Sequence, residues 1–157
     1  MAQIFSAWWN RLPILVAIGG GLAPSLALAG VWYFFSPAYT DVGYQPVQPV
    51  AYSHRLHVGE LGLDCRYCHA SVESSAVANV PPTQTCMNCH QTVKRDSPAL
   101  APIRDSMQSG RPMRWIRAHK LPEYAYFTHD MHVTAGIGCV TCHGRIDEME
   151  KVTQVTP

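Results

Sequence analysis

The sequence predicts a mostly α-helical and irregular chain, with one membrane-spanning helix at its N-terminus and a loop-rich domain of short helices behind it. Two observations carry this expectation. Residues 12–35 form an apolar segment without a charged side chain. Beyond that segment, helical periodicity is short because proline recurs at Pro81, Pro82, Pro98, Pro102, Pro112 and Pro122. We therefore expect short helices, long loops and little sheet in the second part of the chain.

The apolar segment 12–35 is longer than the roughly 20 residues that a helix needs to cross a bilayer. Trp8 and Trp32 lie near its two ends, as in the aromatic belts of membrane interfaces. A cleavable signal peptide is the alternative, since Ala27-Leu28-Ala29 resembles a cleavage site. The apolar run continues past that site to Phe35, which favours an uncleaved transmembrane helix over about 12–35.

The chain is expected to divide into three regions. Residues 1–35 contain the membrane helix, residues 36–53 form a proline-rich linker, and residues 54–157 form the domain. Arg11 precedes the apolar segment, so the positive-inside rule places the domain on the outer side of the membrane. The formal net charge is +1 and basic residues do not cluster, which argues against nucleic-acid binding.

All six cysteines lie in three Cys-x-x-Cys-His motifs, and none remains for a disulfide. Two cysteines on one helical turn can bond the two vinyl groups of a porphyrin, and the histidine that follows presents its imidazole to the iron. Zinc is the alternative, but zinc ribbons use two cysteine pairs per metal and need no histidine after each pair. The motifs predict three covalently attached haems c. The attachment residues are Cys65, Cys68, Cys86, Cys89, Cys139 and Cys142, and the proximal iron ligands are His69, His90 and His143.

Five further histidines are candidates for the second axial position of the irons. Four of them belong to an internal repeat, because an aromatic residue, a hydroxyl residue and His-x-x-His-Val precede both the first and the third motif. The repeat predicts distal ligands at His54, His57, His129 and His132. His119 has no repeat behind it and is the fifth candidate. Bis-histidine iron has no open position, so such haems relay electrons and do not bind substrate.

Methionine is the alternative distal ligand. Met107, Met113, Met131 and Met149 are available, but none lies in a repeated context. The histidine pattern resembles that of the small class III multihaem cytochromes. By that resemblance, His54 pairs with His69 and His129 with His143, while His57 serves a neighbouring haem, the one at His90.

The stretch from His57 to Glu150 resembles the multihaem cytochrome subunit of bacterial alternative complex III, a quinol-oxidising complex. The resemblance lies in four segments, His57–His69, Val80–His90, Trp115–Tyr126 and Gly136–Asp147 with its CHGRID ending. That family's subunit usually carries five motifs, whereas this sequence has three. Either the chain is a shortened version with two surplus histidines, or it continues to two further haems, with His132 and His119 as candidate ligands of haems outside this sequence.

The resemblance implies an electron-transfer subunit that is not an enzyme on its own. Its partners would be a polytopic quinol-oxidising subunit and an iron-sulfur subunit. Electrons would leave to a monohaem cytochrome c, a blue copper protein or a terminal oxidase. The location implied is the bacterial cytoplasmic membrane, crossed once, with the haem domain on the periplasmic side.

Two other functions are open to such a sequence. A membrane-anchored multihaem quinol dehydrogenase that feeds a periplasmic reductase shares the single anchor. In that class, however, the first motif lies close to the membrane helix, whereas a proline-rich connector separates Phe35 from Cys65 here. A free exported electron carrier would require removal of the anchor.

Overall fold

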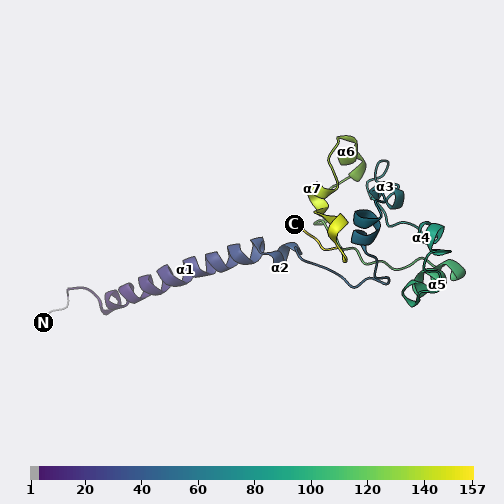
Figure 1. The fold of residues 1–157 in the computed structure, drawn as a ribbon. Coiled ribbons are helices and arrows are strands. Elements are labelled where there is room, and N and C mark those ends of the chain that lie inside the picture. Colours follow the sequence, from purple (N-terminus) through teal and green to yellow (C-terminus); the bar gives the residue numbers. More distant parts are fainter. Residues whose placement is uncertain (1–3) are drawn as a thin grey trace. The chain divides into compact units, whose positions relative to one another are not determined.

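The computed structural model describes residues 4–157, except for the side chains of 37 and 38. The chain forms two compact units that divide between Thr40 and Asp41. Helices and irregular segments make up both units, and residues 4–157 contain no strand (Figure 1). The predicted fold class is therefore confirmed.

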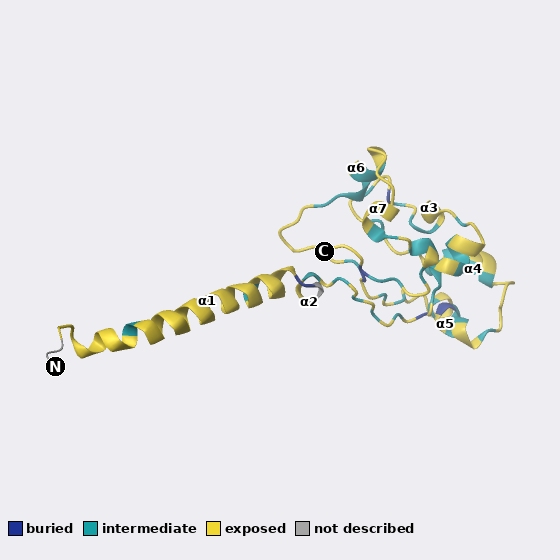
Figure 2. Cartoon of the chain, turned by 60° about the vertical axis from the view of Figure 1, so that its left-hand side comes forward, coloured by how far each residue is buried: buried dark blue, intermediate teal, exposed yellow. Residues whose placement is uncertain are grey.

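The first unit is dominated by one long helix. A 3-10 turn, η1 (Ala7–Arg11), leads into α1 (Leu12–Phe35), and the short α2 (Pro37–Thr40) follows. Within Ala7–Phe35 an 18-residue window has a mean hydropathy of 2.0 and no buried residue, so this helix is long and apolar enough to cross a membrane. Figure 2 shows α1 exposed along nearly its whole length. The bounds of α1 agree with the span expected from the sequence.

Local chemistry explains where α1 begins and ends. Proline in the first turn is tolerated because the first amides of a helix have no carbonyl partner within it. The helix ends at Ser36, where the backbone turns extended and the buried hydroxyl donates a hydrogen bond of 2.9 Å to the Tyr33 carbonyl oxygen. That bond satisfies one of the carbonyl groups left free at the end of the helix.

The second unit contains only short helices. They are η2 (Arg55–Glu60, a π-helix), α3 (Cys65–Cys68), α4 (Thr83–His90), η3 (Pro98–Leu100), α5 (Ala101–Ser109), α6 (His129–Thr134), α7 (Val140–His143) and η4 (Ile146–Glu148). Figure 1 shows α4 and α5 side by side, and α6 and α7 close together in another part of the unit.

The extended segment that opens the second unit lies along the C-terminal residues. Gly43 donates a backbone hydrogen bond of 2.8 Å to Gln154, and Gln154 donates one of 3.0 Å to Tyr44. The Gln45 side chain adds a bond of 2.7 Å to the Thr153 hydroxyl. Residues 43–45 are thus held by polar contacts to the other end of the unit.

Polar side chains also tie this segment to the middle of the chain. Gln48 bonds both the amide and the carbonyl of Ile116, at 2.9 and 2.7 Å. Because one side-chain amide satisfies both backbone groups of a residue far away in sequence, Gln48 fixes the two segments in register.

The apolar interior of the second unit is small. Its buried hydrophobic residues are Val50, Val72, Ile103 and Ala118, and no large side chain of residues 4–157 is fully buried. Figure 2 shows correspondingly few dark segments. Burial on this scale cannot offset the conformational entropy of ordering such a unit. Additional apolar mass is needed, and the covalently attached porphyrins that the sequence predicts would supply it.

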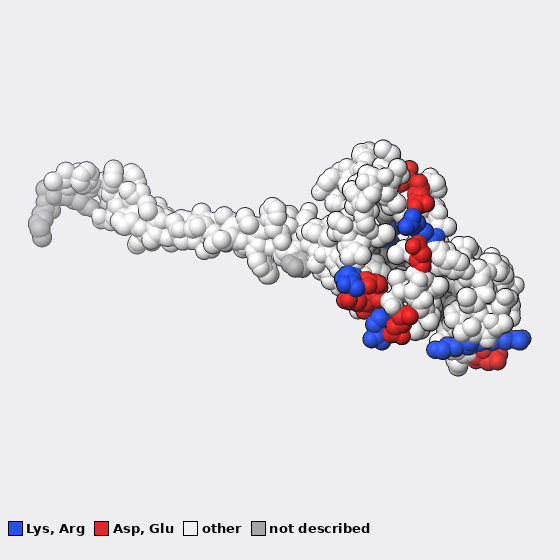
Figure 3. Space-filling view, turned by 45° about the horizontal axis from the view of Figure 1, so that its top comes forward, with Lys and Arg blue, Asp and Glu red and all other residues white. Residues whose placement is uncertain are grey.

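Charged residues gather on the second unit, and α1 is free of them in Figure 3. Some of these charges form pairs, such as Arg66 with Glu73 at 2.7 Å and Arg145 with Asp147 at 2.6 Å. More than half of each arginine side chain is exposed, so these pairs add little to stability.

Candidate haem attachment sites

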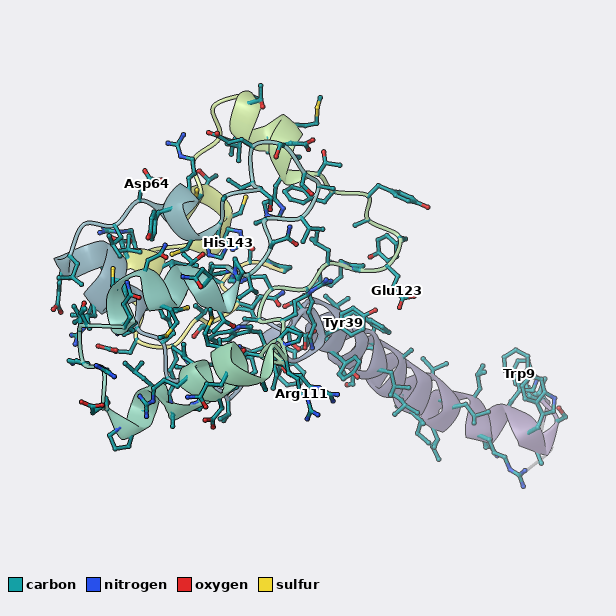
Figure 4. The ribbon with its side chains drawn as sticks, turned by 90° about the vertical axis from the view of Figure 1, so that its right-hand side faces the viewer. Trp9, Tyr39, Asp64, Arg111, Glu123 and His143 are labelled. Atoms are coloured by element: carbon teal, nitrogen blue, oxygen red, sulfur yellow. The ribbon has the colours of Figure 1, made fainter. Side chains whose placement is uncertain are left out.

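Each Cys-x-x-Cys-His motif occupies about one helical turn, as attachment to one porphyrin requires. In α3 the His69 amide donates to the Cys65 carbonyl at 2.9 Å, and beside α7 the His143 amide donates to Cys139 at 3.0 Å. The second motif forms the end of α4. Asp64 caps α3 by accepting a hydrogen bond of 2.8 Å from the Arg66 amide. Figure 4 labels Asp64 beside α3 and His143 at the end of α7.

None of the six cysteines forms a disulfide. Burial raises the pKa of Cys65, Cys68 and Cys86, and neighbouring thiols raise the pKa of Cys65 and Cys68 further. Within residues 4–157, no three His, Cys, Asp or Glu side chains converge on a common point as a metal-ion site. The motifs thus present cysteine pairs on helical turns. The arrangement of the imidazoles near them determines which cofactor the motifs can bind.

Backbone carbonyls orient two of the three motif histidines. His69 Nδ1 lies 2.6 Å from the Asn79 carbonyl oxygen, and His90 Nδ1 lies 3.0 Å from that of Val93. Since a carbonyl oxygen only accepts, Nδ1 carries the proton and the lone pair of Nε2 is free for a metal. His143 Nδ1 is buried without a hydrogen-bond partner.

The sequence repeat upstream of the first and third motifs is also a structural repeat. His57 Nδ1 lies 2.8 Å from the Ser53 carbonyl oxygen, and His132 Nδ1 lies 2.8 Å from that of Thr128. In both copies the second histidine of the His-x-x-His pair therefore has a free Nε2 lone pair. The hydroxyl residues of the repeat thus hold these rings through their backbone carbonyls, and in the first copy the Ser53 hydroxyl also accepts a hydrogen bond of 3.0 Å from the Leu56 amide.

The aromatic residue of each repeat packs against both histidines that follow it. The Tyr52 ring lies 4.8 Å from His54 and 4.4 Å from His57, measured between centroids. Phe127 lies at the same two distances from His129 and His132. In the sequence these aromatics are visible as part of the repeat, without an assigned role. Their recurrence two and five residues before the histidines is the signal that could have identified them as supports for the imidazoles.

Two histidine pairs have the separation that one iron between them requires. Imidazole nitrogens bind such metals at about 2 Å, so two rings on opposite sides of one metal have centroids about 6 Å apart. His57 and His90 are 6.1 Å apart with ring planes at 65°. His129 and His143 are 6.2 Å apart with nearly parallel planes, at 7°. Both pairs fit a bis-histidine haem.

The other candidate histidines are arranged differently. His54 lies near His69, and burial, followed by the charges of His69 and His57, lowers its pKa to about 4. Burial lowers the pKa of His143 to about 4 as well. Low pKa values keep these imidazoles neutral, the form that binds a metal.

His119 contacts a motif histidine too closely to share a metal with it in this arrangement. Its ring centroid lies 4.3 Å from that of His143, edge to face at 83°. The His119 Nε2 atom is buried without a hydrogen-bond partner, and burial lowers the pKa of the ring.

Surface hollows open beside two of the motifs. One lies between α4 and α5 and is lined by Met87, His90, Met107 and Arg104, among others. The second is lined by Cys68 and the loop that runs to Pro82. Cysteine pairs, free Nε2 atoms, imidazole pairs and a sparse protein core together fit covalently attached haem c.

A curated relative agrees with this chemistry. The chain is 32% identical over 131 residues to the menaquinone reductase, multiheme cytochrome c subunit, of Nitratidesulfovibrio vulgaris (strain Hildenborough). The likeness is to a multihaem cytochrome c. The match takes in 79% of this chain and 60% of the relative, so the chain spans about 60% of the relative's length. No protein-family model matches the chain. The relative supports covalently bound haem c and membrane-associated electron transfer.

Proposed function

We propose that this chain is the membrane-anchored electron-transfer subunit of a quinone-linked or quinol-linked oxidoreductase complex. The observation that best supports this proposal is that imidazole pairs lie with ring centroids about 6 Å apart at Cys-x-x-Cys-His turns. The same chain also has one long apolar helix. Haem c bound at these turns supplies a one-electron iron couple. The residues at and around these turns would hold, orient and shield that haem.

The three proposed iron sites use the following imidazole pairs: His69 with His54, His90 with His57, and His143 with His129. Ring separations support the second and third pairs. The proximity of His54 to His69 supports the first. Each pair would hold one haem iron from two sides and leave no position for substrate, so the sites would relay electrons.

His132 is proposed as an axial ligand for a haem attached outside residues 1–157. Its ring is held as the His57 ring is held, by a backbone carbonyl and an aromatic face. His57 has His90 opposite, whereas no ring contact joins His132 to a motif histidine within residues 4–157. His119 is proposed as a second candidate ligand for such a haem, because its Nε2 atom is buried without a hydrogen-bond partner.

The proposed partners are a polytopic quinone-reactive membrane subunit and an iron-sulfur subunit. Resemblance to alternative complex III supports them and implies quinol oxidation, with a monohaem cytochrome c, a blue copper protein or a terminal oxidase as acceptor. The curated relative is named for the reduction of menaquinone, which is the opposite direction. We propose that the chain links a membrane quinone site in a partner to an external redox carrier, and the direction of flow is a measurable property of the complex.

The proposed location is the bacterial cytoplasmic membrane, with the haem domain on the periplasmic side. The apolar helix α1 and the covalent haem chemistry support it, since c-type attachment is completed outside the cytoplasm. A proteolysis test on intact spheroplasts checks the orientation, because residues 41–157 should be accessible from the outside.

Purification of the full haem-loaded chain in mild detergent tests the proposed function. A polytopic subunit and an iron-sulfur protein should co-purify with it. The complex should exchange electrons between a menaquinol analogue and an external carrier, and the faster direction identifies its role. Oxidation of quinol by the purified chain alone would instead support the membrane-anchored quinol dehydrogenase.

A further inference from the structure

The three motifs do not follow one another in space as they do in the sequence. The first and second motifs touch directly through the residues between their cysteines. Asn88 donates a hydrogen bond of 3.1 Å from Nδ2 to the Tyr67 hydroxyl oxygen. Both residues occupy the same position of their motifs, directly before the second cysteine. The two helical turns are therefore in contact at corresponding positions.

Side chains around this contact place the same two motifs together. The Tyr52 ring, upstream of the first motif, stacks on His57 with ring centroids 4.4 Å apart, and the His57 ring lies 6.1 Å from that of His90 in the second motif.

The segment that precedes the third motif lies against the loop that follows the first. Along α6, which precedes the third motif, the backbone amides of His129 and Asp130 donate to the carbonyls of Ala76 and Ser75, at 3.1 and 3.3 Å. Those carbonyls belong to the loop that leaves the first motif. His129 Nδ1 adds a bond of 2.9 Å to the Ala76 carbonyl oxygen.

The first motif therefore contacts its two neighbours in different ways. A side-chain hydrogen bond joins it to the second motif, and backbone hydrogen bonds join the loop behind it to the segment before the third. Within residues 41–157, no hydrogen bond, ion pair or ring contact joins the second motif to the third.

We propose that the motif Cys65–His69 is the central attachment site, with the motif at 86–90 on one side of it and the motif at 139–143 on the other. This order rests on the proposed electron-transfer function, which it deepens by naming the internal relay. Tyr67 and Asn88 are positioning residues, because their hydrogen bond holds two attachment turns together. Electrons would then pass from the second motif to the first and on to the third, or in the reverse order.

Iron positions in the haem-loaded full chain test the order directly. Anomalous scattering at the iron edge from crystals of the detergent-solubilised protein gives the separations of the three attached irons. The separation between the irons at His90 and His143 should be the longest of the three. If either separation that includes the His69 iron is the longest, the order is wrong. Iron positions do not depend on the redox partner, so this result stands or falls separately from the proposed function.

A charge placed at the junction gives a second test in solution. Asn88→Asp puts a carboxylate between the first and second sites, so it should lower the midpoint potentials of two irons and leave that of the third unchanged. Thr141→Asp is the matched control, because it changes the same position of the third motif and should leave the iron at His90 unchanged. A shift of only one potential in Asn88→Asp, or a shift at the third site, would contradict the proposal.

Assignment of each potential uses methionine as a label. Single changes His54→Met, His57→Met and His129→Met each mark one site by a sulfur-to-iron charge-transfer band, and Asn88→Asp is then added to each. The labelled potential should fall in the first two backgrounds and stay constant in the third. A labelled potential that falls only in the His129→Met background would overturn the order.

Discussion

The imidazole planes of His129 and His143 lie 7° from parallel, with ring centroids 6.2 Å apart. His119 approaches the same His143 ring at 4.3 Å, edge to face. Only the longer separation leaves space for a metal between two nitrogens at about 2 Å each. Geometry therefore favours His129 over His119 as the axial partner of His143.

Replacing the favoured ligand should change the spectrum of one haem. In His129→Met, a thioether takes the place of an imidazole, so a sulfur-to-iron charge-transfer band should appear and one midpoint potential should rise. Near-infrared absorption and a potentiometric titration measure the two effects. His119→Met is the matched control, measured on a protein that carries only the three haems attached within residues 1–157, and should show neither. A band in the His119 variant alone would reverse the assignment.

The parts of this molecule that the sequence predicted are those with a periodic or repeated signal. An uncharged apolar run predicted α1 at its observed bounds, Leu12–Phe35, and the prolines predicted short helices behind it. Both signals are local, because segment length and proline geometry act within one element.

The relative placement of the motifs could not be predicted in this way. It depends on single polar contacts between residues far apart in sequence, such as Asn88 with Tyr67 and Gln48 with Ile116. One hydrogen bond leaves no periodic pattern, and either partner alone reads as an ordinary surface residue. The distal-ligand candidates were predictable because the repeat marked four of them, whereas His119, which has no repeat, showed its contact with His143 only in the structure.

The two copies of the repeat should respond differently to the same change. In His57→Met, the methionine faces the iron at His90, so a charge-transfer band should appear. In the His132 copy the same kind of backbone carbonyl holds the ring, but no motif histidine of residues 4–157 lies opposite it. His132→Met should therefore leave the spectrum of haems attached within residues 1–157 unchanged. A band in the His132 variant of a protein that carries only these three haems would disprove the external-ligand proposal.

Haem attachment should be required for residues 41–157 to fold. Few of their side chains are buried, and no large one is buried fully. When the full chain is expressed without the haem-attachment machinery, far-ultraviolet circular dichroism in detergent should lose the helical signal of the second unit, while α1 stays helical. Limited proteolysis should then cut throughout residues 41–157. A haem-free protein with a cooperative thermal transition and a protected second unit would contradict this.

Gly59 should be the least replaceable residue of η2. Its backbone passes so close to η4 that an added Cβ would overlap the Asp147 carbonyl oxygen. Gly59→Ala forces the two helices apart, and overpacking of this kind costs about 1–3 kcal/mol in the free energy of unfolding. Thermal or denaturant unfolding of the haem-loaded protein measures the loss. Glu60→Ala is the matched control from the same helix, because it removes only an exposed pair with Arg55 at 3.8 Å, worth less than about 1 kcal/mol. Equal losses in the two variants would show that η2 does not pack against η4 as closely as the Gly59 backbone indicates.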